Sequence, residues 1–171
     1  MKTQLSDFVS VTSPSKPVIE VVMVYDDFAS GRHAMEIYHR LISQFDGKCE
    51  FRLRDWTIGL LRNHALNDIA IQEATDAQVI IIALGGEELP PAVKKWVEGW
   101  RVYRSAPHAI LSAFLTCRAH ADGSYPVEDY LRHSAADCGR EFLIEKSQPW
   151  VDWCEVPPKA VSSQKPKLKR L

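Results

Sequence analysis

Two adjacent carboxylates, Asp26 and Asp27, come directly after the apolar run from Val18 to Tyr25. Such a run, followed by a short polar loop and an amphipathic segment, is typical of a buried strand that leads into a helix. In an open α/β sheet, ligands bind outside the carboxyl ends of the strands, which is where this loop is expected to lie. Mg²⁺ prefers oxygen ligands, so the pair could hold this ion together with water. The alternative is that the acids are solvated, or cap the next helix, whose dipole favours negative charge.

Ser30, Gly31 and Arg32 follow the acidic pair at the start of that helix. Backbone N–H groups at a helix N-terminus, together with a guanidinium group, are able to hold a phosphate. The place in the chain resembles the loop with which flavodoxins hold the phosphate of their flavin, and this resemblance implies nucleotide or flavin binding. The loop departs from the Ser- and Thr-rich pattern, however, and its two acids would repel a phosphate unless a metal bridged them.

A second loop is expected at the same edge of the sheet. Gly85, Gly86 and Glu87 follow another apolar run. If the two runs are neighbouring parallel strands, we expect these residues to meet the acidic pair at the topological switch point. With Mg²⁺ on the acids, Arg32 and the amides of the two glycines would meet a phosphate there.

Cys117 and His120 lie in the loop that is expected after the fourth strand. A thiolate nucleophile needs a base within reach and an electropositive setting, which Arg118 could supply. No oxyanion motif accompanies the pair, and a Cys at a strand end is more often part of a core. We therefore assign no catalytic residue, and the pair stands only as an alternative nucleophile hypothesis.

Apolar periodicity predicts the elements that position these residues. Strands are expected over about residues 19–25, 49–54, 78–84, 108–116 and 141–145, and helices over about 29–45, 58–75 and 125–138. Asn63 and Asn67 are both candidates to cap or interrupt the stretch 58–75. A further helix opens at Pro90 and Pro91, since proline is tolerated in the first turn. It carries Trp96 and Trp100 on one face, which we interpret as core packing.

This alternation predicts an α/β fold, a three-layer doubly wound parallel sheet of about five strands with helices on both faces. The third strand is apolar on both faces and the first and fourth are mostly apolar, whereas the second and fifth are weaker and suit the edges of a sheet. The strand order that places them there is 2-1-3-4-5, which is flavodoxin-like or receiver-like.

Four residues at strand ends resemble the pattern of the receiver domains of response regulators. Asp26 and Asp27 match the acid pair after strand one, Thr116 matches the hydroxyl after strand four, and Lys146 matches the lysine after strand five. The phosphoacceptor Asp after strand three is missing, because the chain reads Leu-Gly-Gly at 84–86. The resemblance implies a degenerate, non-phosphorylated relative, in which Lys146 points toward the acid pair.

Charge is distributed unevenly along the chain. The net charge is −1, and the last 13 residues hold five cations and no acid: Lys159, Lys165, Lys167, Lys169 and Arg170. Removing these five from the net charge leaves −6 for residues 1–158. A short basic tail supplies few phosphate contacts, so nucleic acid is an unlikely partner.

The sequence also predicts how the chain is divided. We expect a flexible leader over 1–17, a single α/β domain over 18–156 and a disordered basic tail over 157–171. Trp150, Trp153 and Cys154 are expected to dock back on the domain. None of the four cysteines forms a C-x-x-C pair, and no apolar run suggests a signal peptide or a membrane span. These features predict a cytoplasmic protein with free thiols.

Two functions remain open on the sequence alone. The first is a non-catalytic, receiver-like regulatory or protein-interaction domain with an unknown protein partner, and the sequence leaves a homo-oligomer open. The second is a small Mg²⁺-dependent enzyme, or a nucleotide- or flavin-binding protein, that acts at the switch point. A binding module predicts a shallow switch point and an exposed apolar patch elsewhere, whereas an enzyme predicts an open pocket with convergent polar groups.

Overall fold

The computed structural model describes residues 15–45, 47–116 and 126–146, except for the side chain of Lys146. The strands are β1 (Val18–Tyr25), β2 (Glu50–Thr57), β3 (Val79–Leu84), β4 (Ile110–Leu115) and β5 (Glu141–Lys146). The helices are α1 (Phe28–Gln44), α2 (Ile58–Leu61), α3 (His64–Asp76), α4 (Pro91–Trp100) and α5 (Pro126–Cys138). The predicted leader boundary, the basic tail and the docking tryptophans fall outside the described residues or at their margin.

The five strands form one parallel sheet in the order β2-β1-β3-β4-β5, as predicted. The apolar strand β3 is buried along its whole length, whereas β2 alternates half-buried and exposed residues at the edge. A parallel strand buried on both faces must be apolar on both, which is why the composition predicted the order. The switch point lies between β1 and β3, where the chain reverses its direction of travel across the sheet.

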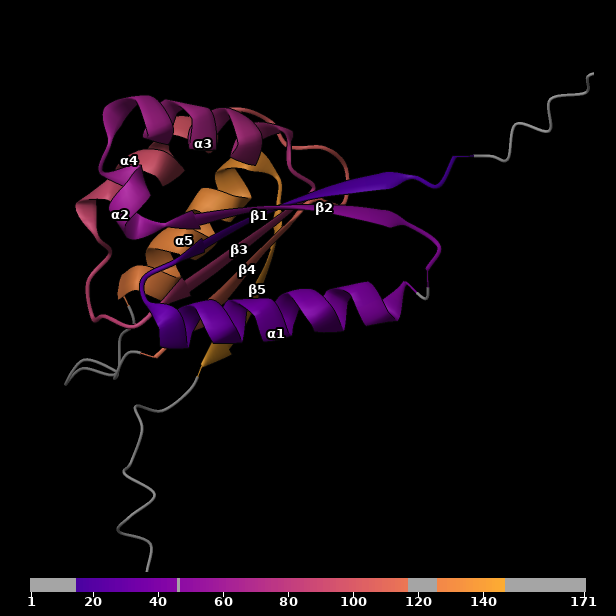
Figure 1. Cartoon of the computed structure of the whole chain (residues 1–171). Coiled ribbons are helices and arrows are strands. Elements are labelled where there is room, and N and C mark those ends of the chain that lie inside the picture. The colour runs from indigo at the N-terminus through magenta and orange to yellow at the C-terminus, as the bar shows by residue number, and fades with distance from the viewer. Residues whose placement is uncertain (1–14, 46, 117–125, 147–171) are drawn as a thin grey trace, which may run out of the picture.

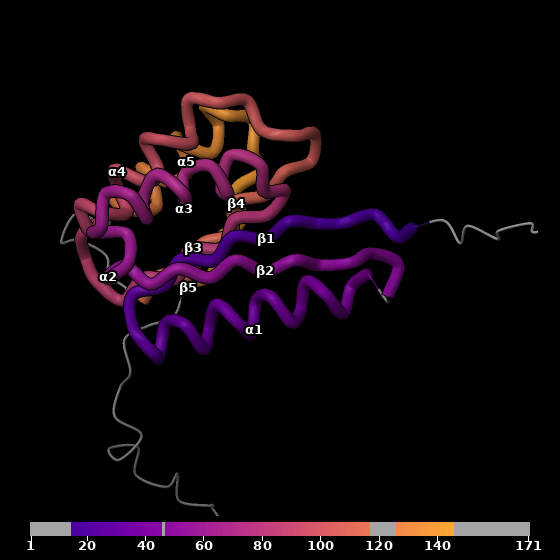
Figure 2. Tube along the Cα trace, turned by 45° about the horizontal axis from the view of Figure 1, so that its top comes forward, coloured from indigo at the N-terminus to yellow at the C-terminus, as the bar shows by residue number. Residues whose placement is uncertain are grey.

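Helices cover the two faces unequally. Figure 1 shows α1 alone on one face, with the other described helices on the opposite face. The larger core lies under α2, α3, α4 and α5, and both Trp96 and Trp100 are buried in it, as the sequence predicted. The smaller core lies between α1 and the sheet. Figure 2 shows β1 and β2 running side by side above α1 and extending past the other strands.

One predicted strand boundary is wrong, and the structure selects between two candidate helix caps. The second strand continues through Trp56 and Thr57, because pairing with β1 extends as far as Tyr25 opposite Thr57. The helical stretch expected over 58–75 is two helices, α2 and α3. Of the two candidate caps, Asn63 interrupts the stretch and accepts a hydrogen bond from the backbone nitrogen of Leu66 at 3.2 Å. An Asn side chain at this position satisfies an N–H group that has no partner within the helix, so it starts a new helix.

Candidate functional site

The loop after β1 is closed by hydrogen bonds between Asp27 and Ser30. The Asp27 carboxylate accepts from the Ser30 backbone nitrogen at 2.8 Å and caps α1. In return, Ser30 Oγ accepts from the backbone nitrogens of Asp26 at 3.1 Å and Asp27 at 2.9 Å. The pair forms a reciprocal capping box, with Ser in the place that Glu or Gln usually takes.

This cap determines the electrostatics of the loop. Hydrogen bonds from the backbone and then the hydroxyl of Ser30 hold the pKa of Asp27 below its ordinary value. The N-terminus of α1 therefore already carries a fixed anion on its own chain. An incoming phosphate would meet this charge and would have to replace it, because both need the same donors.

The ends of β1, β3 and β4 come together at the switch point. The Asp26 nitrogen donates to the Ala83 carbonyl at 3.3 Å. Thr116 donates to the Leu84 carbonyl from its backbone nitrogen at 3.1 Å and from its hydroxyl at 3.3 Å. A Cβ atom on Gly85 would lie 3.5 Å from Thr116 Oγ1, so these two residues are neighbours.

The other residues of the predicted site lie in the loop after β3, on α1 and at the end of β5. Gly86 and Glu87 are exposed in the loop after β3, and Arg32 is exposed at the start of the second turn of α1. The backbone of Lys146 pairs with Leu115 at the end of β5, but its side chain lies outside the described residues. The hypotheses for Cys117 and His120 also fall outside them, so their geometry stays a prediction.

The acidic pair was expected to hold Mg²⁺ or to cap the helix. Asp27 does cap α1, and Asp26 is exposed beside it. Over the described residues, no group of three or more His, Cys, Asp or Glu side chains is arranged to hold a metal ion. Any ion here would depend on one free carboxylate, one shared carboxylate and water.

A hollow that the sequence patterns did not predict lies on the β2 side of α1. We call it the Phe28 groove. It has a volume of about 640 Å³ and an apolar floor of Met23, Met35 and Leu53. Phe28 stands at its rim with 87% of its surface exposed. One signal was available in the sequence, because Phe28 lies outside the apolar stripe of the helix and so does not face the core.

Polar groups mark the ends of the Phe28 groove. Tyr25 and Asp55 lie together on neighbouring strands, and burial, followed by the charge and hydrogen bond of Asp55, raises the pKa of Tyr25. Arg32 and His39 line the groove from α1 and are exposed. Gly31 brings the helix close to the sheet at this point, since a Cβ atom there would lie 2.9 Å from the Tyr25 ring.

Comparison with known proteins identifies the fold. No protein-family model and no curated protein matches the chain. Among solved structures, the chain is similar to a flavodoxin of Streptococcus pneumonia TIGR4, with a TM-score of 0.51 and 10% sequence identity. The likeness covers 77% of this chain and 86% of that one. At this identity it shows the flavodoxin-like fold, as the sequence predicted, and it leaves the ligand and the receiver resemblance open.

One further prediction concerned membranes. In the described part of the chain, no helix has both the length and the apolar character needed to cross a bilayer.

Proposed function

We propose that this chain is a non-catalytic protein-interaction domain, and that the Phe28 groove is its contact surface. The observation that carries the proposal is the exposure of Phe28, 87% of whose surface is open beside an apolar floor. A large aromatic side chain gains little by standing in water, whereas aromatic anchors dominate the energetics of protein interfaces.

The lining of the groove favours a protein partner with an apolar anchor. Met23 and Met35 form part of the floor, and methionine adapts its shape to different apolar side chains. The exposed charges of Arg32 and Asp55 at the rim are of opposite sign, which suits mixed polar contacts around a buried centre. A receiver-like regulatory role is consistent with this surface, because the chain has no phosphoacceptor after β3 and would act through binding alone.

The alternative is a Mg²⁺-dependent enzyme or a nucleotide- or flavin-binding protein at the switch point. It has less support, because Asp27 occupies the N-terminus of α1 and holds its charge there. The flavodoxin-like fold keeps this alternative worth testing, since related architectures bind ligands at the same edge of the sheet.

Position-specific photo-cross-linking tests the proposal. A benzophenone amino acid at position 28 should capture a distinct protein in extracts of the source cell, and the same probe at Val102 should not. Val102 is 72% exposed and is absent from the residues that line the groove, so it is a matched control.

The captured protein is then purified and its affinity measured. Phe28→Ser should weaken its binding at least tenfold, while Val102→Ser leaves binding unchanged. Equal capture from both positions, or equal affinity of both variants, would refute the Phe28 groove as the contact surface.

A further inference from the structure

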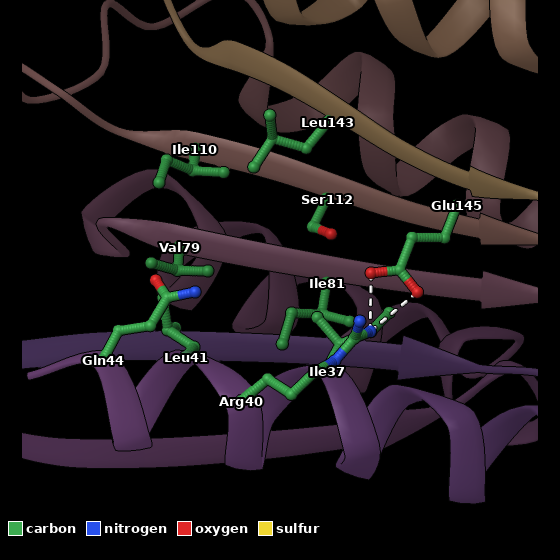
Figure 3. Close-up of a pocket in the computed structure, with 10 residues that line it drawn as sticks. All are labelled: Ile37, Arg40, Leu41, Gln44, Val79, Ile81, Ile110, Ser112, Leu143 and Glu145. Carbon is green, nitrogen blue, oxygen red and sulfur yellow. Dashed lines mark hydrogen bonds and ion pairs between the residues drawn. The ribbon is translucent and has the colours of Figure 1, made fainter.

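A second hollow lies on the other side of α1, over β3, β4 and β5. We call it the sheet groove. Figure 3 shows its floor, made of inward-facing side chains from the three strands: Val79, Ile81, Ile110, Ser112 and Leu143. Helix α1 forms one wall, and the hollow measures about 190 Å³. Among the described helices α1 alone covers this face, so the β5 side is left open and Leu143 is 45% exposed.

An open half of a parallel sheet needs an explanation. Parallel sheets occur almost only with both faces covered, because their strands are apolar on both. On the opposite face, Phe142 and Ile144 of β5 pack against the core with α5. On the groove face, the equivalent position of the same strand is the exposed Leu143. Some segment is therefore expected to cover the groove.

We propose that the C-terminal segment from Trp150 to Val156 packs into the sheet groove and completes this face of the sheet. The segment follows β5 directly, and β5 is the strand that borders the groove. It contains two tryptophans, Trp150 and Trp153, within the first seven residues after Lys146. Pro149 favours a turn just before them.

The chain after β5 is long enough for Trp153 to reach the sheet groove. Leu143 lies three residues before the end of β5, or about 10 Å back along the strand at roughly 3.3 Å per residue. A chain that turns over 147–150 and returns for three residues brings Trp153 level with Leu143. The 25 residues that follow Lys146 supply far more length than this path requires.

The size of the hollow also favours this occupant. Its volume of about 190 Å³ is below the range of roughly 300–1,000 Å³ that is usual for small-molecule sites. A hollow of this size suits one large aromatic side chain. Arg40 and Glu145 pair across one end at 2.5 and 2.7 Å, which closes the groove to a broad partner surface there (Figure 3).

Intramolecular cross-linking in the full chain identifies the occupant. A benzophenone amino acid at position 143 should cross-link to residues 147–158 of the same molecule. The same probe at Ile69, which is 51% exposed on α3 over the other face, should give no such product. A product with residues 1–14, a product between two molecules or no product at position 143 would each overturn the proposal.

Point variants provide a second test. Trp153→Ser should lower the melting temperature by about 5 °C, since a buried aromatic side chain is lost, and should increase the binding of a dye for exposed apolar surface. Leu168→Ser removes an apolar residue from the same tail beyond the proposed segment. This variant should change neither the melting temperature nor the binding of the dye. Equal melting temperatures for the two variants would contradict the proposal. If Trp153→Ser fails to fold, the cross-link at position 143 still tests whether the C-terminal segment occupies the sheet groove.

Discussion

The carboxylate of Asp27 lies 2.8 Å from the backbone nitrogen of Ser30, and the hydroxyl of Ser30 accepts from the backbone nitrogen of Asp27 at 2.9 Å. Each residue therefore satisfies a backbone group of the other at the start of α1. The loop that contains Asp26, Asp27 and Ser30, which the sequence predicted as a ligand site, therefore also stabilises the connection between β1 and α1.

Asp27→Ala should destabilise the protein by about 1 kcal/mol, because it removes the N-cap of α1. Asp26→Ala is the matched control, since its exposed side chain makes no hydrogen bond in the described structure and the change should be nearly neutral. Urea denaturation followed by circular dichroism measures both. Equal losses in the two variants would argue against a capping role for Asp27.

The Asp27 cap should also depend on pH. Its pKa is below the ordinary value in the folded chain, so its contribution to stability is present above the unfolded pKa of about 3.9 and is lost as the pH falls through the folded pKa. Asp27→Asn keeps a capping side chain without the titration. The difference in unfolding free energy between wild type and this variant should be constant from neutral pH to about 4 and decline below it. A difference that grows on acidification would contradict this assignment.

Gly31→Ala should destabilise the protein by about 1–3 kcal/mol, because the new methyl group would lie 2.9 Å from the Tyr25 ring in a packed region. The control is Gly59→Ala in α2, where the new Cβ atom would lie 3.7 Å from the Thr57 hydroxyl, an ordinary contact distance. That change should be neutral or mildly stabilising, because alanine reduces the freedom of the unfolded chain. Thermal melts of the two variants compare the effects, and a neutral Gly31→Ala would show that α1 can move away from Tyr25.

Thermal melts with EDTA, with Mg²⁺ and with Mg²⁺ plus flavin mononucleotide distinguish the two proposed functions. The interaction domain predicts no change in melting temperature with any of them. A ligand present at 100 times its dissociation constant would add about 2.7 kcal/mol of stability, and thus raise the melting temperature by several degrees. A rise that disappears in Asp26→Ala would favour the alternative and make the acidic pair a working site.

Local sequence signals determined most of the fold. The apolar runs of β1, β3 and β4 require burial on both faces, and the weaker β2 and β5 therefore fall at the edges. The apolar periodicity of α1 and α5 and the prolines that open α4 located these helices to within a few residues. The sequence offers both Asn63 and Asn67 as caps, and the structure selects Asn63, because Asn67 is buried inside α3.

The candidate site depended on relationships that a sequence does not contain. Asp26 and Asp27 are adjacent acids of the same type, yet only one of them caps α1, because the loop directs its carboxylate toward Ser30. The Phe28 groove joins α1 to β1 and β2, which are brought together by the packing of a helix across the sheet.

The sequence by itself therefore determined the class of fold and the edge of the sheet at which polar residues gather, because hydrophobic periodicity and strand composition are local properties. Only the tertiary structure decided which of the two acids caps α1 and which sides of α1 border a solvent-exposed groove. Those outcomes depend on side-chain direction and on distances between elements far apart in the chain, which no spacing of residues encodes.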